Sequence, residues 1–294
     1  MTDPALTALW LRITLAFGFG GYKKWQYIDI DDVKNSVEML LSNPALQNDE
    51  HINKYKRLSS KQIDSIFETC KKNDISIVTP SDEEYPERFR HLPDPPSVLF
   101  VLGDIRSVSD VPSVAIVGAR ECCDYSASLS GTFAASLAEH GINIVSGFAR
   151  GIDQRAHLAA LEAGSVTTAF LGSGILRDYP KGTMRLKKLI SEHGAVISEY
   201  LPTSFPTKQS FKVRNRMISA LSDCVLVAEA SSHSGALNTA NHAAEQGKEV
   251  FVIPPHDLYD KRFDGQSELL LDGAQIAVHP DQIFEFLMEL YGRK

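Results

Sequence analysis

Residues 113–118 read SVAIVG, an apolar run of strand length that ends in glycine, and this run opens a repeating pattern. Comparable runs follow it, each separated from the next by a stretch of helical length: INIVSG (142–147), VTTAFLG (166–172), AVISE (195–199), CVLVAEA (224–230) and EVFVIP (249–254). Apolar strands that alternate with helices are typical of a parallel sheet with helices on both faces. The sequence therefore predicts an α/β fold, an extended Rossmann-like, doubly wound and mainly parallel sheet.

The residues before this pattern are predicted to form a small helical N-terminal domain. Between Pro4 and Lys72 apolar residues recur at helical spacing, with Ser59 placed to cap a helix. The segment FGFGG (17–21) can be a helix-hairpin-helix turn whose amides hold a phosphate, or a plain tight turn. Two short strands, ISIVTP and SVLFVLG, then surround PDPP (93–96).

These patterns predict three parts of the chain. We expect a helical module of SAM-like or helix-hairpin-helix-like type over residues 1–74, a connecting segment with short strands over 75–111, and the Rossmann-like domain over 112–294.

Several classes of protein are disfavoured by composition. No apolar run approaches the roughly 20 residues of a membrane helix. The start MTDPALTALW has no basic region or small-residue cleavage site, so we expect a cytoplasmic protein. The cysteines, Cys70, Cys122, Cys123 and Cys224, show no CxxC spacing, so we expect neither a metal site nor disulfides.

The charge is unevenly distributed along the chain. The formal net charge is −7, which is unusual for a protein that binds nucleic acid. Between Gly172 and Ser222, however, nine Lys or Arg stand against three acids, and no acid occurs from Tyr200 to Ser222. Such a run is either a solvated basic face or the site of an anionic partner.

Glycines and small hydroxyl residues follow the predicted strands. The runs are GAR (118–120), SGFARG (146–151), GSG (172–174) and SG (234–235). Glycine lets the backbone approach a ligand, and the following helix N-terminus offers amides to a phosphate. The alternative is that these glycines only form tight turns. Neither GxGxxG nor a Walker A motif is present, so a dinucleotide site or an ATPase is disfavoured.

Cations and aromatic residues accompany these glycines. Arg120 and Arg150 directly follow strand ends, where a guanidinium can bind phosphate in a forked geometry. Lys212, Arg214 and Arg216 are expected at the start of a helix, where the macrodipole disfavours cations unless an anion is bound. Four aromatic residues are candidates either for base stacking or for the core: Tyr179, Tyr200, Phe205 and Phe211.

Several of these segments also resemble the DprA/Smf family. SGFARGID (146–153), followed by Ala156 and His157, is similar to the family's SGxARGID…AH signature. The other similar blocks are GSG (172–174) with YPK (179–181), FKVRNR (211–216), SGALNTA (234–240) and the upstream region from Val78 to Asp104. The resemblance covers most of residues 75–278.

The resemblance implies a Rossmann-like domain that binds single-stranded DNA, forms a homodimer and helps to load a RecA-type recombinase during natural transformation. No catalytic residue, cofactor, metal or membrane is implied, and Asp153 and His157 take structural roles. The implied DNA-binding residues are Gly118, Arg120, Ser146, Gly147, Arg150, Gly172, Lys181, Lys212, Arg214, Asn215, Arg216, Ser234, Gly235 and Thr239. We expect Arg150 and Arg214 to be exposed, so that their removal weakens DNA binding without unfolding the protein.

The chain departs from the family pattern at some positions. After Lys181 it has Gly182-Thr183-Met184 where the family usually has an asparagine, which puts one polar contact in doubt. Two alternatives remain open: a phosphoribohydrolase that cleaves nucleoside monophosphates, with Glu199 or Glu229 as its carboxylate, and a module that senses a free nucleotide. The PGGxGTxxE motif of such hydrolases is not found.

Overall fold

The computed structural model describes residues 3–292, which divide into two compact units. The smaller unit contains the described residues up to Leu102 together with Ser173–Arg177 and Ile197–Phe205. The larger unit contains Gly103–Gly172, Asp178–Val196 and the described residues from Pro206 onward. No helix within residues 3–292 has the length and apolar character needed to cross a membrane.

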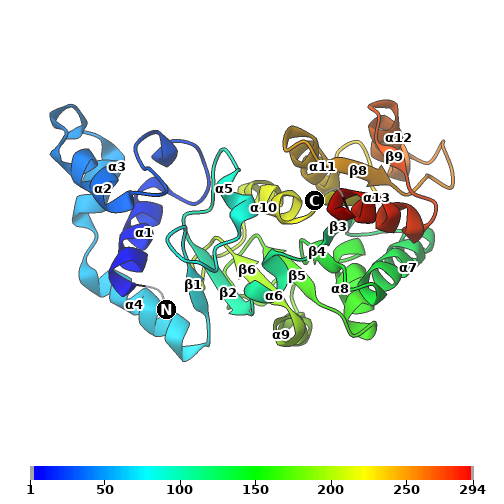
Figure 1. Ribbon diagram of the computed structural model, residues 1–294, viewed down its shortest axis with the longest axis horizontal. Helices are drawn as coiled ribbons and strands as arrows, with labels where there is room; N and C mark the ends of the chain where they lie inside the picture. Colours follow the sequence, from blue (N-terminus) through cyan, green and yellow to red (C-terminus); the bar gives the residue numbers. More distant parts are fainter. Residues whose placement is uncertain (1–2, 293–294) are drawn as a thin grey trace. The chain divides into compact units, whose positions relative to one another are not determined.

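The smaller unit is mainly helical. Its helices are α1 (Pro4–Phe17), α2 (Val33–Ser42), α3 (Glu50–Arg57), α4 (Ser60–Lys72) and α5 (Glu87–Arg90), and its strands β1 (Ser76–Val78) and β2 (Leu99–Gly103) pair antiparallel (Figure 1). Ser59 caps α4 in a reciprocal capping box with Gln62. In the FGFGG turn, the amides of Gly20 and Gly21 donate to the carboxylates of Glu199 and Asp94, so both amides bond to carboxylates of the chain itself.

The repeating apolar runs form the strands that the sequence predicts. These six strands are β3 (Ser113–Gly118), β4 (Asn143–Ser146), β5 (Thr167–Leu171), β6 (Ala195–Ser198), β7 (Cys224–Glu229) and β8 (Glu249–Val252). A further short strand, β9 (Gln275–Ile276), was not predicted. The helices are α6 (Arg106–Ser109), α7 (Asp124–Glu139), α8 (Ile152–Glu162), α9 (Met184–His193), α10 (Lys208–Leu221), α11 (Gly235–Glu245), α12 (Asp264–Leu271) and α13 (Pro280–Gly292).

Within the larger unit the strands lie in the order β5-β4-β3-β7-β8-β9, and each pair is parallel. The chain runs outward from β3 through β4 to β5, and later returns to place β7 on the other side of β3. This reversal is the topological switch point at which open parallel sheets bind ligands, at the carboxyl ends of the strands. The prediction of a doubly wound, mainly parallel sheet is confirmed.

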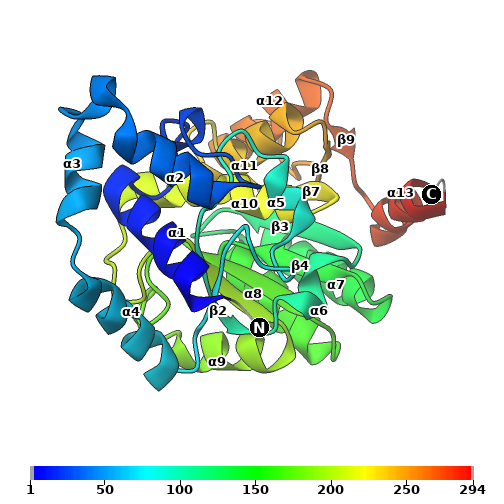
Figure 2. The same cartoon turned by 60° about the vertical axis from the view of Figure 1, so that its left-hand side comes forward.

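Helices cover both faces of these strands, as Figures 1 and 2 show. On one face α7, α8 and α13 enclose a core with alternate strand residues such as Ile116, Leu226 and Phe251. On the other face α10 and α11 pack together and bury Met217 and Ala240. Because both faces are covered, the apolar runs have no polar alternation.

Candidate functional site

The loop between β4 and α8 folds onto the connection that follows β3. Gly151 has a φ of +77°, and a Cβ atom there would lie 2.4 Å from the carbonyl oxygen of Ala119. The amide of Ile152 donates to that same oxygen at 3.2 Å. Only glycine suits this position, since both its conformation and the close approach exclude a side chain. The loop therefore sets Arg120 and Arg150 at neighbouring strand ends.

Asp153 holds this loop from inside. The Oδ2 atom of its buried carboxyl group accepts the Ala149 amide at 3.0 Å. Burial raises the pKa of Asp153 to about 6, while Arg214 acts in the opposite direction by favouring the charged form. The expected structural role of Asp153 at the start of α8 agrees with this geometry.

Arg214 ties the ends of two strands together. Its guanidinium donates to the carbonyl oxygen of Gly147 at 2.6 Å and to that of Phe170, and its Nε donates to Asn215 Oδ1 at 3.0 Å. The side chain is only 4% exposed, so the expectation of an exposed cation is wrong. The backbone carbonyls at the ends of β4 and β5 draw the guanidinium inward, because those oxygens need buried donors.

The helix that carries Arg214 also begins earlier than the sequence pattern predicts. α10 starts at Lys208, where Thr207 and Ser210 form a capping box. Arg214 and Arg216 therefore lie about two turns inside the helix, beyond the reach of its terminal dipole. The argument that a bound anion must offset the dipole is wrong for these two residues.

Phe211 lies at the centre of an aromatic and cationic cluster. Its half-buried ring lies 5.5 Å from that of Tyr179, and the Arg120 guanidinium carbon lies 5.3 Å from its centroid. A Cβ atom on Gly172 would approach the ring to 2.5 Å, so glycine at the end of the β5 run makes room for it. We call Phe211, Tyr179 and Arg120 the Phe211 cluster. An arginine beside an aromatic face can bind phosphate while a base stacks nearby.

Four of the fourteen expected site residues are exposed cations. They are Arg120, Arg150, Lys181 and Lys212, on the connections after β3, β4 and β5 and on α10. The Lys181 turn is held by Asp178, whose carboxylate accepts the amides of Gly182 and Thr183 at 3.0 and 3.1 Å. These bonds, the Gly182 amide foremost, lower the pKa of Asp178. Asp178 was not predicted as part of the site, although aspartate is a residue that often accepts backbone amides in turns.

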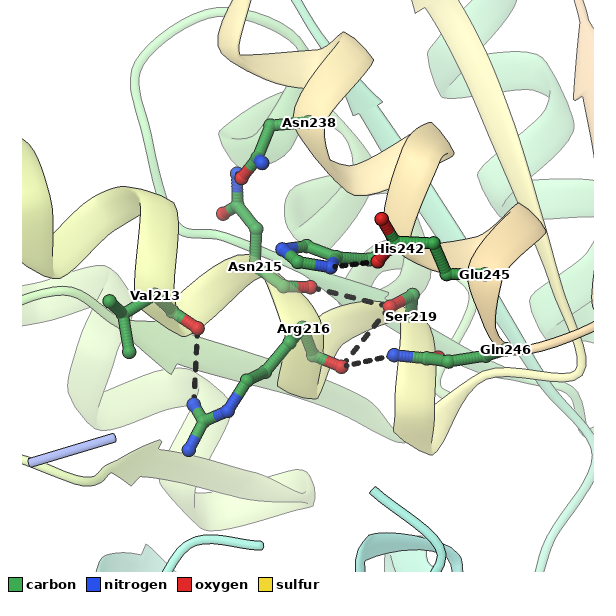
Figure 3. Close-up of polar contacts among 8 residues, drawn as sticks. All are labelled: Val213, Asn215, Arg216, Ser219, Asn238, His242, Glu245 and Gln246. Carbon is green, nitrogen blue, oxygen red and sulfur yellow. Dashed lines mark hydrogen bonds and ion pairs between the residues drawn. The ribbon is translucent and has the colours of Figure 1, made fainter. Parts of the chain in front are cut away.

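A second group of expected site residues is buried between α10 and α11. The Asn215 amide donates to the Gly235 carbonyl and to Asn238 Oδ1, each at 3.2 Å. Figure 3 shows the Arg216 carbonyl oxygen accepting from Ser219 and Gln246, while the Arg216 guanidinium donates to the Val213 carbonyl. Ser234 caps α11 by accepting the Ala236 amide, and Thr239 is buried. This group joins the two helices, and only exposed Gly235 and half-exposed Ser234 reach the surface.

Residues at the strand ends contact the loops and side chains that form the site. The Ser146 hydroxyl is fully buried and donates to the Ile116 carbonyl at 2.6 Å. A Cβ atom on Gly118 would lie 2.6 Å from the Ile152 side chain, and one on Gly147 would lie 2.8 Å from Arg214. His157 is buried and bonds through Nδ1 to the Thr167 hydroxyl at 2.7 Å, in keeping with its expected packing role.

Comparison with known proteins identifies the family. Residues 76–288 match the family described as DNA recombination-mediator protein A. The chain is 35% identical to the DNA processing protein DprA of Bacillus subtilis over 215 residues, which is 73% of this chain and 72% of that protein.

Solved structures agree with this match. The DprA structure from Streptococcus pneumoniae is similar with a TM-score of 0.75 and 31% identity, covering 96% of this chain and 94% of that one. A structure of Helicobacter pylori DNA processing protein A, reported for its single-stranded DNA binding mode, has a TM-score of 0.66 and 33% identity, covering 73% and 96%. The chain belongs to the DNA recombination-mediator protein A family, the DprA/Smf proteins.

Proposed function

We propose that this protein binds single-stranded DNA along the carboxyl ends of β3, β4 and β5, protects it, and helps to load a RecA-type recombinase. The observation that carries the proposal is the Phe211 cluster with its accompanying exposed cations. The Helicobacter pylori relative, reported for single-stranded DNA binding, supports the choice of ligand. We further propose that residues 112–294 form the DNA-binding domain and that the protein acts as a homodimer.

The exposed cations suit a phosphate backbone. Arg120, Arg150 and Lys181 come from three separate connections and Lys212 from α10, so several successive phosphates can be neutralised. Two of the supporting loops are held by buried or bonded carboxylates, Asp153 and Asp178. Such bonds reduce the entropy that is lost when a loop binds its ligand.

The Phe211 cluster favours an unpaired strand. A base stacks on an aromatic ring only after it leaves its neighbours, and a single strand offers its bases at little cost. The half-buried ring of Phe211 is fixed by Gly172, Tyr179 and Arg120, so it presents a set orientation. We therefore propose direct stacking of one base on this cluster.

The two carboxylates that could serve a nucleotide hydrolase are bonded to backbone amides. Glu229 is buried and accepts the Cys123 amide at 2.9 Å, and buried Glu199 accepts the Gly20 amide at 3.0 Å. A general base needs access to a reacting proton, which these positions do not favour. Within residues 3–292 no three His, Cys, Asp or Glu side chains form a possible metal site.

Titration of a fluorescent oligo-dT and of the matching duplex at two salt concentrations tests the proposal. We expect tighter binding of the single strand and weaker binding at higher salt, because counterions are released from the phosphates. Arg150→Ala should weaken binding of the single strand. Its matched control is Arg57→Ala, which removes an exposed arginine on α3 and should leave the affinity unchanged. Equal affinity for both DNAs, or free base released from a nucleoside monophosphate in a parallel assay, contradicts the proposal.

Recombinase loading needs a separate assay. A RecA-type recombinase is mixed with oligo-dT coated by single-strand binding protein, and filament formation is followed with and without this protein. We expect faster filament formation, and sedimentation of the free protein is expected to show a dimer. No acceleration refutes the loading role while leaving DNA binding intact.

A further inference from the structure

We propose that Phe205, supported by Arg177, is a second base-stacking platform for single-stranded DNA, a contact that rests on the function proposed above. Phe205 lies in the smaller unit, on the loop between β6 and α10. The residue is 72% exposed. All 14 phenylalanines lie within residues 3–292, and Phe205 alone among them is exposed. The other phenylalanines are all at least half-buried, so the Phe205 ring is the one largely exposed phenylalanine face within residues 3–292 that is open to a ligand.

The ring is held in place by a stacked arginine. The guanidinium carbon of Arg177 lies over the Phe205 ring, 3.6 Å from its centroid, so the two groups are in van der Waals contact. The Arg177 Nε donates to the Thr203 carbonyl oxygen at 2.6 Å, which fixes the guanidinium. This arrangement orients the ring before any ligand arrives.

The backbone beneath this pair is also tightly held. The Gly174 amide donates to the Ser204 carbonyl at 3.0 Å, and the Leu176 amide donates to the Pro202 carbonyl at 2.9 Å. A Cβ atom on Gly174 would lie 2.2 Å from the Leu201 carbonyl oxygen, so the two segments approach as closely as glycine permits. The exposed ring therefore lies on a loop that is held by backbone hydrogen bonds.

The chemistry of the pair fits one nucleotide. The exposed ring offers an aromatic face to a base, while the positive charge of the Arg177 guanidinium attracts the phosphate of the same nucleotide. The 23 residues from Tyr200 to Ser222 contain no acid, so no carboxylate on this segment repels a phosphate. A flat aromatic face beside a cation matches the stacking face of a nucleobase, so the occupant that we propose is a nucleobase.

The test compares Phe205→Ala with Phe205→Trp, using Tyr22→Ala as the control because Tyr22 is an exposed aromatic residue elsewhere. Each variant is titrated with oligo-dT and with an abasic oligonucleotide of equal length. We expect Phe205→Ala to weaken oligo-dT binding by about 5- to 150-fold, since one stack is worth roughly 1–3 kcal/mol. Abasic binding and the salt slope should not change, and Phe205→Trp should restore affinity and have its fluorescence quenched by oligo-dT alone.

The outcomes separate this inference from the function it rests on. If the unaltered protein does not bind oligo-dT, the proposed function fails and the platform fails with it. If the unaltered protein binds but Phe205→Ala binds equally well, only the platform is refuted. An equal loss toward the abasic strand also refutes it, because the contact would then not involve a base.

Discussion

Arg214 and Phe211 lie three residues apart on α10 and have different roles. The guanidinium of Arg214 is buried and bonds to the ends of two strands, whereas the Phe211 ring is half-buried among groups that can meet a ligand. The presence of an arginine in the family motif therefore does not by itself identify a residue that contacts DNA. Burial decides which arginines support the site and which can bind phosphate.

Replacing Arg214 should lower the free energy of unfolding of the protein. Arg214→Ala leaves the Gly147 and Phe170 carbonyls without this donor and removes the cation beside Asp153, so we expect a loss of about 3–5 kcal/mol in the free energy of unfolding. Arg214→Lys keeps the positive charge but loses the forked donors of the guanidinium. Its free energy of unfolding should therefore lie between those of Arg214→Ala and the unaltered protein. Urea denaturation measures both, with Arg150→Ala expected within about 0.5 kcal/mol of the unaltered protein. A stable Arg214→Ala protein would contradict the role assigned to the guanidinium.

Asp153 should make the folded protein less stable as pH rises. Its pKa is raised from 3.8 to about 6, so between these values the native state binds more protons than the unfolded state. The cost is fully present above pH 6 and corresponds to on the order of 3 kcal/mol. Asp153→Asn should gain stability relative to the unaltered protein as pH increases from 4 to 7, as measured by urea denaturation at each pH. A pH-independent difference would show that Asp153 does not titrate in this window.

His157 should act in the opposite direction. Burial lowers its pKa from 6.5 to about 3, so the unfolded state takes up the proton first as the pH falls. Thr167 donates its hydroxyl to the Ile144 carbonyl, which leaves His157 Nδ1 as the donor to Thr167. His157→Asn keeps a donor there and should lose less stability than the unaltered protein between pH 6.5 and 3, whatever its stability at pH 7. Parallel acid-denaturation curves would contradict this.

At the scale of elements, the packing of α10 against the strand ends orients the Phe211 cluster. The capping box at Thr207 starts the helix, and the Ser210 hydroxyl bonds to the Gly172 carbonyl at 2.5 Å. The first turn of α10 is thus anchored to the end of β5, which leaves the Phe211 ring over Gly172. Glycine in the β5 turn is needed for this contact rather than for an unusual φ.

Gly172→Ala should therefore displace the Phe211 ring. Because the added Cβ would lie 2.5 Å from the ring, either the ring or the loop must shift. We expect weaker oligo-dT binding with a smaller loss toward an abasic strand. Gly131→Ala on α7, whose Cβ would meet Arg155 at an ordinary 3.6 Å, is the control and should bind normally. Unchanged affinity in Gly172→Ala would separate Phe211 from base recognition.

At the scale of the whole molecule, a chain with a net charge of −7 must bind DNA through a local concentration of cations. The dependence of affinity on salt reports how many phosphates those cations neutralise, with a slope of about −0.7 per phosphate for a single strand. The net charge opposes non-specific binding elsewhere on the surface. Affinity should therefore depend on a few arginines and lysines.

Removing two exposed arginines should change that slope additively. We expect the Arg120→Ala and Arg150→Ala single variants each to reduce the slope by about 0.7, and the double variant by about 1.4, with little change in stability. The measurement is oligo-dT affinity at four salt concentrations. A slope that is unchanged in the double variant would move the phosphate path away from the ends of β3 and β4.

Apolar strand runs and glycine-rich strand ends depend on local spacing, so the strands, the parallel sheet and the family could be predicted from the sequence. Four of the DNA-binding candidates named from the sequence are exposed cations in the structure: Arg120, Arg150, Lys181 and Lys212. The sequence did not predict the start of α10 at Lys208 or the burial of four expected site residues, Arg214, Asn215, Arg216 and Thr239. The reason is physical: the carbonyls at strand ends and between helices need buried donors, and which side chain supplies them depends on segments distant in the chain.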